Sequence, residues 1–336
     1  MSETLSCGVL GAGSFGTALA SVLLENGHDV TLWCYEDGHA DEVNAAGRNT
    51  RYQTDFPLPG IKATGDLEEA ARGKDLVLFV SPSHVTRSLA RTVAPLLEDV
   101  SLIVCAAKGI EASGGTMDEA LREELPERLH HRLAYLSGPS FAFEVLGHKP
   151  TAVVCAARDE EVAERVQRAF ATSYFRTYRT TDVVGVELGG AVKNVIAIAT
   201  GLCDGLEMGH DARAALITRG LAEMSRLGAA MNADPMTFMG LAGMGDLVLT
   251  CCGDLSRNRT VGKRLASGMT LDEVTESLGG QVAEGVKTTA STRALAKKLG
   301  VDMPIVEAVW RILYDGKDPK GTVNVLMGRP LKSERE

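Results

Sequence analysis

The first 180 residues alternate between short apolar runs and segments of helical character, and this alternation limits the folds that the chain can adopt. Segments with helical periodicity occupy residues 17–26, 85–97 and 116–125, among others. Strands that alternate with helices in this way are typical of a doubly wound, mostly parallel sheet with helices on both faces. The apolar runs that we interpret as strands are residues 5–10, 30–33, 75–80, 101–105, 133–136, 151–155 and 175–180.

The pattern changes after about residue 181, where strand-like runs give way to long segments of small and apolar residues. A chain of 336 residues is longer than one hydrophobic core usually serves. We therefore predict an α/β domain over residues 1–181 and an all-α domain over residues 182–336. The segments of the second domain that have helical spacing are residues 183–206, 211–227, 270–278, 284–299 and 304–314.

Composition excludes several classes of protein. The net charge is −9, whereas a nucleic-acid partner selects a basic face, so we expect no binding to nucleic acid. No stretch approaches the roughly 18 apolar residues of a membrane span, and we see no basic segment of a signal peptide. The seven cysteines lack CxxC spacing, and the adjacent pair Cys251 and Cys252 is a poor chelator of a single metal. We expect a cytoplasmic protein with reduced cysteines, no metal and no membrane insertion.

A glycine-rich turn, GAGSFG, joins the first apolar run to the first helix. Gly11, Gly13 and Gly16 form a GxGxxG pattern there. Between a strand and a helix, such glycines permit a tight turn, close approach of a pyrophosphate to the backbone, and close helix packing. The phosphates then bind the free N–H groups at the positive end of the helix. This context favours a Rossmann-like, dinucleotide-binding domain over an ordinary glycine-rich turn.

An acidic pair follows the second apolar run. Glu36 lies about twenty residues after Gly16, where an acid would bind the adenosine ribose hydroxyls of NAD. A basic residue there would accept the 2′-phosphate of NADP instead. Glu36 and Asp37 therefore favour NAD, although both could simply start a loop or cap a helix.

A lysine stands within the apolar segment VGVELGGAVKNVIAIATG. On a helix, Gly190, Lys193, Asn194 and Ala197 share one face. Because nearly all its neighbours are small or apolar, we expect burial to favour the neutral form of Lys193. Such an ammonium can donate a proton to a ketone oxygen, and the neutral amine can take one from an alcohol. The alternative is a lysine whose charged head reaches solvent.

Other polar residues could complete a ligand site. Lys108 follows the apolar run at 101–105, at the carboxyl end of the predicted sheet, where ligands of open α/β sheets bind. It could equally be a surface lysine. Ser140, in the loop SGPSFAFE, offers a hydroxyl at the possible start of a helix. The SRN triplet at 256–258 combines a hydroxyl, a guanidinium and an amide, which suits a phosphate, or it could cap a helix on the surface.

Together these motifs resemble the bacterial type of NAD(P)-dependent glycerol-3-phosphate dehydrogenase. The similarity extends over nearly the whole chain, through GAGSFGTALA, AAKGIE, SGPSFA, ELGGAVKNVIAIATG, TRGLAEMSRLG and GLAGMGDLVLTCCGDLSRNR. GAGSFG alone is unspecific, but GGAVKN, GMGDLVLT and SRN in that order are specific. The resemblance implies reversible hydride transfer between NAD or NADP and a small phosphorylated substrate, dihydroxyacetone phosphate or sn-glycerol 3-phosphate. It also implies a supply of glycerol 3-phosphate for phospholipids and a possible homodimer.

The resemblance also assigns residues. Lys193 is then the proton donor and acceptor, Lys108 is its companion, and Asp246 either binds a substrate hydroxyl or orients Lys193. Asn194 and Thr250 match the wall of the site. The substrate-binding positions are Lys108, Gly138, Ser140, Lys193, Asp246, Ser256, Arg257 and Asn258. The cofactor-binding positions are Gly11, Gly13, Ser14, Phe15, Gly16, Tyr35, Lys108, Ala142, Arg257, Val282 and Glu284.

Two alternative functions stay open at the level of sequence, as does the choice of cofactor. Many relatives have Arg or His after the tryptophan of the second strand, where this chain has Cys34, Tyr35 and Glu36, so a preference for NADP does not follow. One alternative is a dehydrogenase of similar build whose anion site binds the carboxylate of a 2-keto or 3-hydroxy acid. The other is a nicotinamide-binding sensor without turnover, which would not need Lys193 in an apolar helix.

Overall fold

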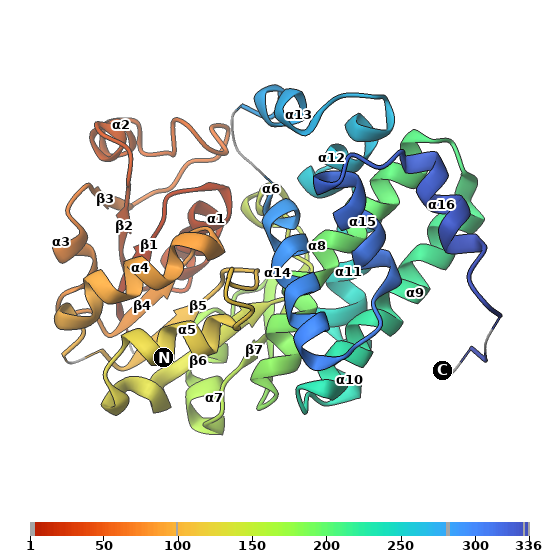
Figure 1. Ribbon diagram of the computed structural model, residues 1–336. Coiled ribbons are helices and arrows are strands. Elements are labelled where there is room, and N and C mark those ends of the chain that lie inside the picture. Colours follow the sequence, from red (N-terminus) through yellow and green to blue (C-terminus); the bar gives the residue numbers. More distant parts are fainter. Residues whose placement is uncertain (1–3, 99, 280–282, 332, 335–336) are drawn as a thin grey trace.

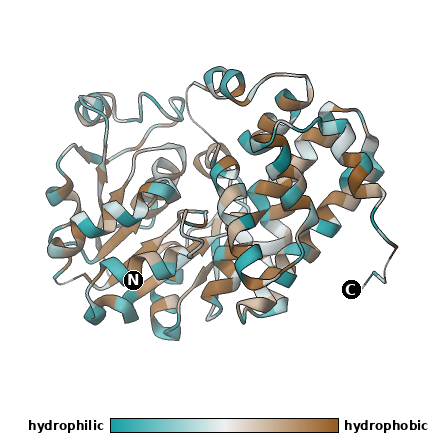
Figure 2. Cartoon of the chain, viewed as in Figure 1, coloured by the Kyte–Doolittle hydropathy of each residue, from teal (hydrophilic) through white to brown (hydrophobic). Residues whose placement is uncertain are grey.

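The structure is a computed structural model that describes residues 4–98, 100–279, 283–331 and 333–334. Figure 1 shows a sheet-bearing region, coloured red to light green, beside a helical region coloured green to blue. Figure 2 shows the strands as a hydrophobic layer, while hydrophilic residues lie on the outer faces of the surrounding helices.

The described residues form one sheet of eight strands in the order β3-β2-β1-β4-β5-β6-β7-β8. β6 and β7 are antiparallel, and the other neighbouring strands are parallel. The predicted doubly wound, mostly parallel sheet is therefore confirmed, with its strand order reversing between β1 and β4. The strands are β1 (Ser6–Leu10), β2 (Asp29–Trp33), β3 (Lys62–Thr64), β4 (Leu76–Phe79), β5 (Leu102–Cys105), β6 (Leu133–Ser137), β7 (Thr151–Ala156) and β8 (Phe175–Thr180).

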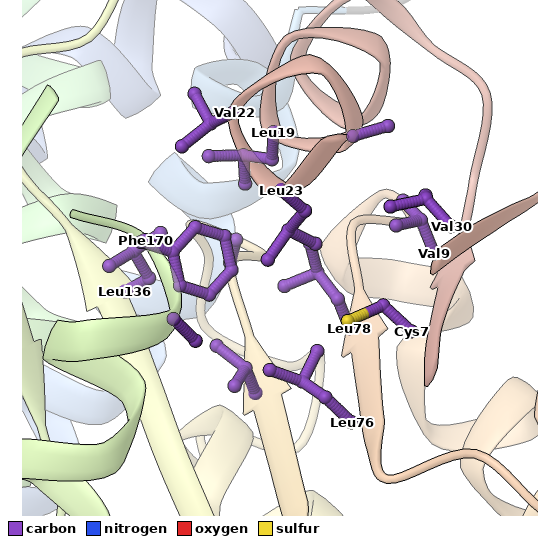
Figure 3. Close-up of a cluster of buried hydrophobic side chains, with 14 of the residues drawn as sticks. Cys7, Val9, Leu19, Val22, Leu23, Val30, Leu76, Leu78, Leu136 and Phe170 are labelled. Atoms are coloured by element: carbon purple, nitrogen blue, oxygen red, sulfur yellow. The ribbon is translucent and has the colours of Figure 1, made fainter. Parts of the chain in front are cut away.

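Helices cover both faces of this sheet because successive residues of a buried strand point to opposite sides. Val9 packs in the core with Leu19, Leu23 and Phe170 (Figure 3), whereas its neighbour Leu10 belongs to the core on the other face. The elements on these faces are α1 (Ser14–Glu25), α2 (His39–Ala46), α3 (Leu67–Ala71), α4 (Ser83–Val93), η1 (Ala94–Leu96), α5 (Met117–Glu124), η2 (Glu127–Arg132), α6 (Ala142–Leu146) and α7 (Glu160–Ala169).

The helical region is built around α8, which is buried along most of its length. By length and composition α8 could cross a membrane, but 94% of its apolar window is buried inside the protein, as in the core helix of a globular region. The helices of the helical region are α8 (Val183–Gly205), α9 (Gly209–Ala230), α10 (Pro235–Met239), the π-helical turn η3 (Leu241–Gly245), α11 (Asp246–Cys252), α12 (Arg257–Ala266), α13 (Leu271–Ser277), α14 (Glu284–Leu299), α15 (Pro304–Tyr314) and α16 (Pro319–Met327).

Two glycines allow α12 to cross closely over α8. A Cβ at Gly201 would lie 2.1 Å from the carbonyl oxygen of Arg259. A Cβ at Gly262 would lie 2.1 Å from the carbonyl oxygen of Ile198. Only residues without a side chain fit such an approach, and the crossing brings the first turn of α12 beside the middle of α8.

Candidate active site

Two lysines and one carboxylate meet where the loop after β5 faces α8 and α11. Lys193 Nζ donates to Asp246 Oδ1 at 2.6 Å and to Thr250 Oγ1 at 2.9 Å. Lys108 Nζ donates to Asp246 Oδ2 at 2.8 Å and to the carbonyl oxygen of Gly138 at 2.9 Å. One carboxylate therefore joins a lysine from the sheet-bearing region to a lysine from the helical region.

Burial shifts the pKa values of this cluster. Lys193 is only 6% exposed and Asp246 only 1%, so the predicted burial of Lys193 is confirmed. Burial lowers the pKa of Lys193 to about 8 and the charge of Lys108 adds to this, while Asp246 opposes both. Burial would raise the pKa of Asp246, but the two lysines hold it below its usual value. An ammonium with a pKa near 8 can donate and recover a proton close to neutral pH.

A π-helical turn sets Asp246 in place. Asp246 is the first residue of α11 and directly follows η3, a type of turn that is often found at functional sites. η3 packs closely on α8, since a Cβ at Gly189 would lie 2.4 Å from the carbonyl oxygen of Ala242. Gly189 thus permits the approach of η3 that brings this carboxylate to Lys193.

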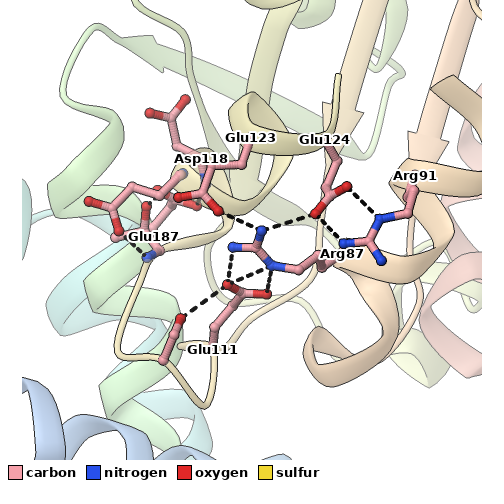
Figure 4. Close-up of polar contacts among 10 residues, drawn as sticks. Arg87, Arg91, Glu111, Asp118, Glu123, Glu124 and Glu187 are labelled. Atoms are coloured by element: carbon pink, nitrogen blue, oxygen red, sulfur yellow. Dashed lines mark hydrogen bonds and ion pairs between the residues drawn. The ribbon is translucent and has the colours of Figure 1, made fainter. Parts of the chain in front are cut away.

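An ion-pair network holds the loop that carries Lys108. Glu111, in that loop, accepts from Arg87 of α4 at 2.6 Å, and Arg87 also contacts Glu123 and Glu124 of α5 (Figure 4). Because these partners lie on two neighbouring helices, the network fixes the loop relative to the sheet. The sequence carried no motif for this network, since each of its members reads as an ordinary surface charge.

The triplet at 256–258 forms the first turn of α12 and its cap. Ser256 Oγ accepts the backbone N–H of Arg259 as the N-cap, so the triplet does cap a helix, but Ser256 and Asn258 are buried and do not form a surface cluster. Asn258 Nδ2 donates to Asn194 Oδ1 at 2.9 Å, and Asn258 Oδ1 accepts from the N–H of Gly285 at 3.0 Å. These bonds fasten the positive end of α12 next to the residue that follows Lys193 in the sequence.

Glu284 starts α14 and lies within the electrostatic influence of three cations. Burial raises its pKa, against the opposing effects of the Ser83 N–H and the charges of Lys193, Arg257 and Lys108. The hydrogen bond from Ser83, at 3.4 Å, joins α4 to α14 and was not predicted from the sequence. The Arg257 side chain is exposed.

Val282, which the resemblance assigned to the cofactor, lies outside the described residues.

The glycine-rich turn fits a pyrophosphate. Gly11 has φ +129°, and a Cβ at Gly16 would lie 1.9 Å from the carbonyl oxygen of Gly11. A Cβ at Gly13 would meet nothing within 4 Å, so the space before the helix is open. α1 begins at Ser14, and among the described residues no side chain caps it. The backbone N–H groups of Ser14 and Phe15 therefore belong to an uncapped, positive helix end that suits an anion.

The turn and the lysine cluster lie at the same edge of the sheet. Lys108 Nζ is 5.4 Å from the ring centre of Phe15. Ser140 Oγ donates to the carbonyl oxygen of Gly138 at 3.0 Å, the same oxygen that accepts from Lys108. The predicted helix start at the Gly-Pro-Ser sequence is wrong, because this hydroxyl bonds backward and α6 begins only at Ala142.

The end of β2 presents an anchored acid and an exposed aromatic ring. Glu36 accepts from Tyr52 Oη at 2.7 Å. Burial alone would raise the pKa of Glu36, but hydrogen bonds from Tyr52, the backbone and His39 hold it below its usual value. Tyr35 is 79% exposed and packs edge-on against Trp33. An anion at this position suits ribose hydroxyls rather than a second phosphate.

The adjacent cysteines Cys251 and Cys252 do not take part in this chemistry. Cys251 is buried, which raises the pKa of its thiol to about 12, and Cys252 is exposed. A thiol with so high a pKa is a poor nucleophile. Within the described ranges, no group of three or more His, Cys, Asp or Glu side chains is arranged to hold a metal.

The glycine-rich turn for a dinucleotide lies beside a buried lysine–carboxylate pair, and the pair lies between an α/β region and a helical region. This combination is that of a nicotinamide-dependent dehydrogenase with a cofactor region and a helical region. Models of "NAD-dependent glycerol-3-phosphate dehydrogenase" match the chain over residues 6–163 for the N-terminal part and 182–324 for the C-terminal part. The chain belongs to this family.

Curated relatives and a solved structure cover nearly the whole chain. Glycerol-3-phosphate dehydrogenase (NAD(P)+) of Syntrophotalea carbinolica is 52% identical over 334 residues, which are 99% of this chain and 100% of the relative. The protein of that name from Geobacter metallireducens is 55% identical over 330 residues, 98% of each chain. The crystal structure of glycerol-3-phosphate dehydrogenase from Coxiella burnetii superposes with a TM-score of 0.91 at 40% identity, covering 97% of this chain and 99% of that one.

Proposed function

We propose that this protein catalyses reversible hydride transfer between NAD(P)H and dihydroxyacetone phosphate, giving sn-glycerol 3-phosphate for phospholipid synthesis. The observation that carries the proposal is the buried Lys193–Asp246–Lys108 cluster beside the glycine-rich turn of a member of this family. The nicotinamide, when bound, supplies or accepts the hydride. The residues of the chain supply the proton, the positive charge and the orientation of the substrate.

Lys193 is the proposed proton donor. Its ammonium is held by Asp246 and Thr250, which leaves one of its three N–H groups for a substrate oxygen. As negative charge grows on that oxygen during reduction, the ammonium stabilises it and then transfers a proton. In the reverse direction the neutral amine accepts the proton of the alcohol. Asp246, whose carboxylate already receives both lysines, orients Lys193, which favours this role over a direct bond to substrate.

The first turn of α12 is the proposed phosphate site. The Arg257 guanidinium and the backbone N–H groups at the positive helix end provide charge-assisted donors. The Ser256 hydroxyl accepts within the turn and retains its hydrogen for an anion, and Asn258 locks the turn against Asn194. We assign Lys108, Gly138 and Ser140 to the opposite wall of the substrate site.

The cofactor site is proposed to run along the carboxyl edge of the sheet. The uncapped end of α1 would hold the pyrophosphate, and Glu36 the adenosine ribose. Its other proposed residues are Gly11, Gly13, Ser14, Phe15, Gly16, Tyr35, Lys108, Ala142, Arg257 and Glu284.

We also propose a division at residue 181 into a cofactor domain and a catalytic helical domain. In support, β8 ends at Thr180 and α8 begins at Val183.

A cytoplasmic location agrees with the seven free cysteines, since a reducing compartment maintains thiols. A homodimer is proposed because Val325, Met327 and Leu331 expose apolar surface that a second copy could cover. Sedimentation at the mass of one chain would contradict the dimer.

The deciding experiment mixes purified protein with dihydroxyacetone phosphate and follows the absorbance of NADH and NADPH in parallel. We expect rapid loss with at least one cofactor, and the ratio of rates reports the effect of Glu36 on the 2′-phosphate. Lys193→Ala is expected to bind cofactor like the wild type while losing at least about a hundredfold in turnover. If the wild-type protein binds the cofactor but does not reduce dihydroxyacetone phosphate, the proposal is contradicted. A panel of 2-keto and 3-hydroxy acids would then separate a related dehydrogenase from a sensor.

A further inference from the structure

A small cavity lies between β6 and α8, next to Lys108. Its volume is about 10 Å³, and the residues that line it include Lys108, Ser137 and Glu187. This volume is close to the minimum that one water molecule needs. The cavity therefore has room for a single small polar molecule behind the proposed site.

Two of the residues that line the cavity each carry a buried polar atom that has no hydrogen-bond partner among the described residues. These atoms are Ser137 Oγ and Glu187 Oε2, and Ser137 is only 5% exposed. The other carboxyl oxygen of Glu187 accepts from the backbone N–H of Asp118 at 2.9 Å (Figure 4). Buried polar atoms of folded proteins nearly always have a partner, and an internal water is the usual one where the protein offers none.

Glu187 can serve as a donor to such a water. Burial raises the pKa of Glu187 to about 8, and the charge of Asp118 adds to this, against the opposing Asp118 N–H and Thr116 hydroxyl. At neutral pH the carboxyl is then mostly protonated.

A glycine keeps the cavity open. A Cβ at Gly190 would lie 2.6 Å from Ser137 Oγ and 3.6 Å from Lys108 Cγ. A side chain at position 190 would therefore collide with Ser137. The second glycine of the GGAVKN motif leaves the space between α8 and these two side chains free.

We propose that this cavity binds one ordered water, which accepts from the Glu187 carboxyl and donates to Ser137 Oγ, and that Ser137 and Glu187 are positioning residues for Lys108. Ser137 directly precedes Gly138, whose carbonyl oxygen accepts from Lys108 Nζ at 2.9 Å. A fixed Ser137 therefore fixes the acceptor that aims Lys108 at Asp246. The effect on catalysis rests on the proposed function, whereas the water site itself does not.

The test combines a high-resolution crystal structure with kinetics of Ser137→Ala, Glu187→Ala and Glu187→Gln. We expect density for a water within hydrogen-bonding distance of both side chains in the wild type, and its loss in the two alanine variants. These variants should lose about tenfold in kcat/KM for dihydroxyacetone phosphate, the scale of outer-shell substitutions. Glu187→Gln keeps an acceptor and a donor, so it should retain more activity than Glu187→Ala.

Thr177→Val is the matched control, because Thr177 Oγ1 is another buried hydroxyl without a described partner, on β8, two strands from β6. We expect unchanged kinetics in this variant. The inference is overturned if the wild-type cavity shows no water, or if Ser137→Ala is as active as Thr177→Val. If Glu187→Ala fails to fold, the structure and kinetics of Ser137→Ala alone test the inference. A wild type that binds the water but does not reduce dihydroxyacetone phosphate would contradict the proposed function alone.

Discussion

At the scale of the residue, Asp246 controls the charge of the site. Its carboxylate receives Lys193 on one oxygen and Lys108 on the other, so the buried cluster carries one net positive charge. Two ammonium groups without this carboxylate would repel each other in a medium that solvates them poorly. The remaining positive charge suits a phosphorylated substrate and an oxygen that becomes negative.

The pKa of Lys193 near 8 predicts opposite pH profiles for the two directions of the reaction. Reduction needs the ammonium, so kcat/KM should fall as pH rises above about 8. Oxidation needs the neutral amine, so kcat/KM should rise through the same range. Steady-state kinetics in both directions from pH 6 to 10 check this, and profiles that fall together would show that Lys193 is not the shared acid and base.

At the scale of the element, a substitution in the first turn of α12 should affect substrate binding more than the chemical step. Arg257→Ala should raise KM for dihydroxyacetone phosphate about tenfold or more, because a charge-assisted bond contributes about 1.5–3 kcal/mol. We expect a smaller change in kcat. The control is Lys263→Ala, an exposed cation in the last turn of the same helix. Equal KM values for the two variants would contradict the phosphate role of Arg257.

In the turn between β1 and α1, one glycine substitution should affect cofactor binding and another should affect stability. Gly13 has φ −70° and open space at its Cβ position, so Gly13→Ala should leave the melting temperature almost unchanged. It should nevertheless weaken NADH binding at least about tenfold, because the added methyl occupies the approach to the backbone. Gly16→Ala should lower the melting temperature, since its Cβ would meet Gly11. Thermal melts and fluorescence titration of both variants distinguish these outcomes.

At the scale of the whole molecule, α8 connects the two regions through its polar residues. Lys193 reaches Lys108 through Asp246, and Glu187 accepts from Asp118 of α5. A buried carboxyl that keeps its proton makes the stability of the fold depend on pH. The same helix therefore positions the site and couples it to the packing of the sheet.

Glu187→Gln should stabilise the protein increasingly as pH rises. Below about pH 4.5 the carboxyl is neutral in the folded and unfolded chain, so the two proteins should be equally stable. Between about 4.5 and 8 only the unfolded chain ionises, which costs the wild type up to about 1.4 kcal/mol per pH unit. Above 8 the difference should level off. Melting temperatures from pH 5 to 9 test this, and a difference that is constant with pH would contradict it.

The sequence alone determined the local features of this protein. The alternation of apolar runs and helices indicated the doubly wound sheet and the helical region. A strand that is buried on both faces leaves a continuous apolar run, and a helix that is buried on one side leaves apolar residues at helical spacing. GAGSFG between a strand and a helix indicated the dinucleotide turn. Small residues around Lys193 predicted its burial. The three-residue strand β3 and the antiparallel pairing of β7 were not predicted, since so short a strand and the direction of pairing leave little or no periodic signal.

Only the tertiary structure decided how the site is assembled. Asp246 lies 53 positions from Lys193 and 138 positions from Lys108 along the chain, and no local pattern relates the three. Their meeting depends on the packing of the π-helical turn, which directly precedes Asp246, against Gly189 of α8, and this is a matter of packing between distant segments. The same packing leaves Ser137 and Glu187 facing one small cavity. Local periodicity records which side of an element is buried, whereas the identity of the partner follows from the complete fold.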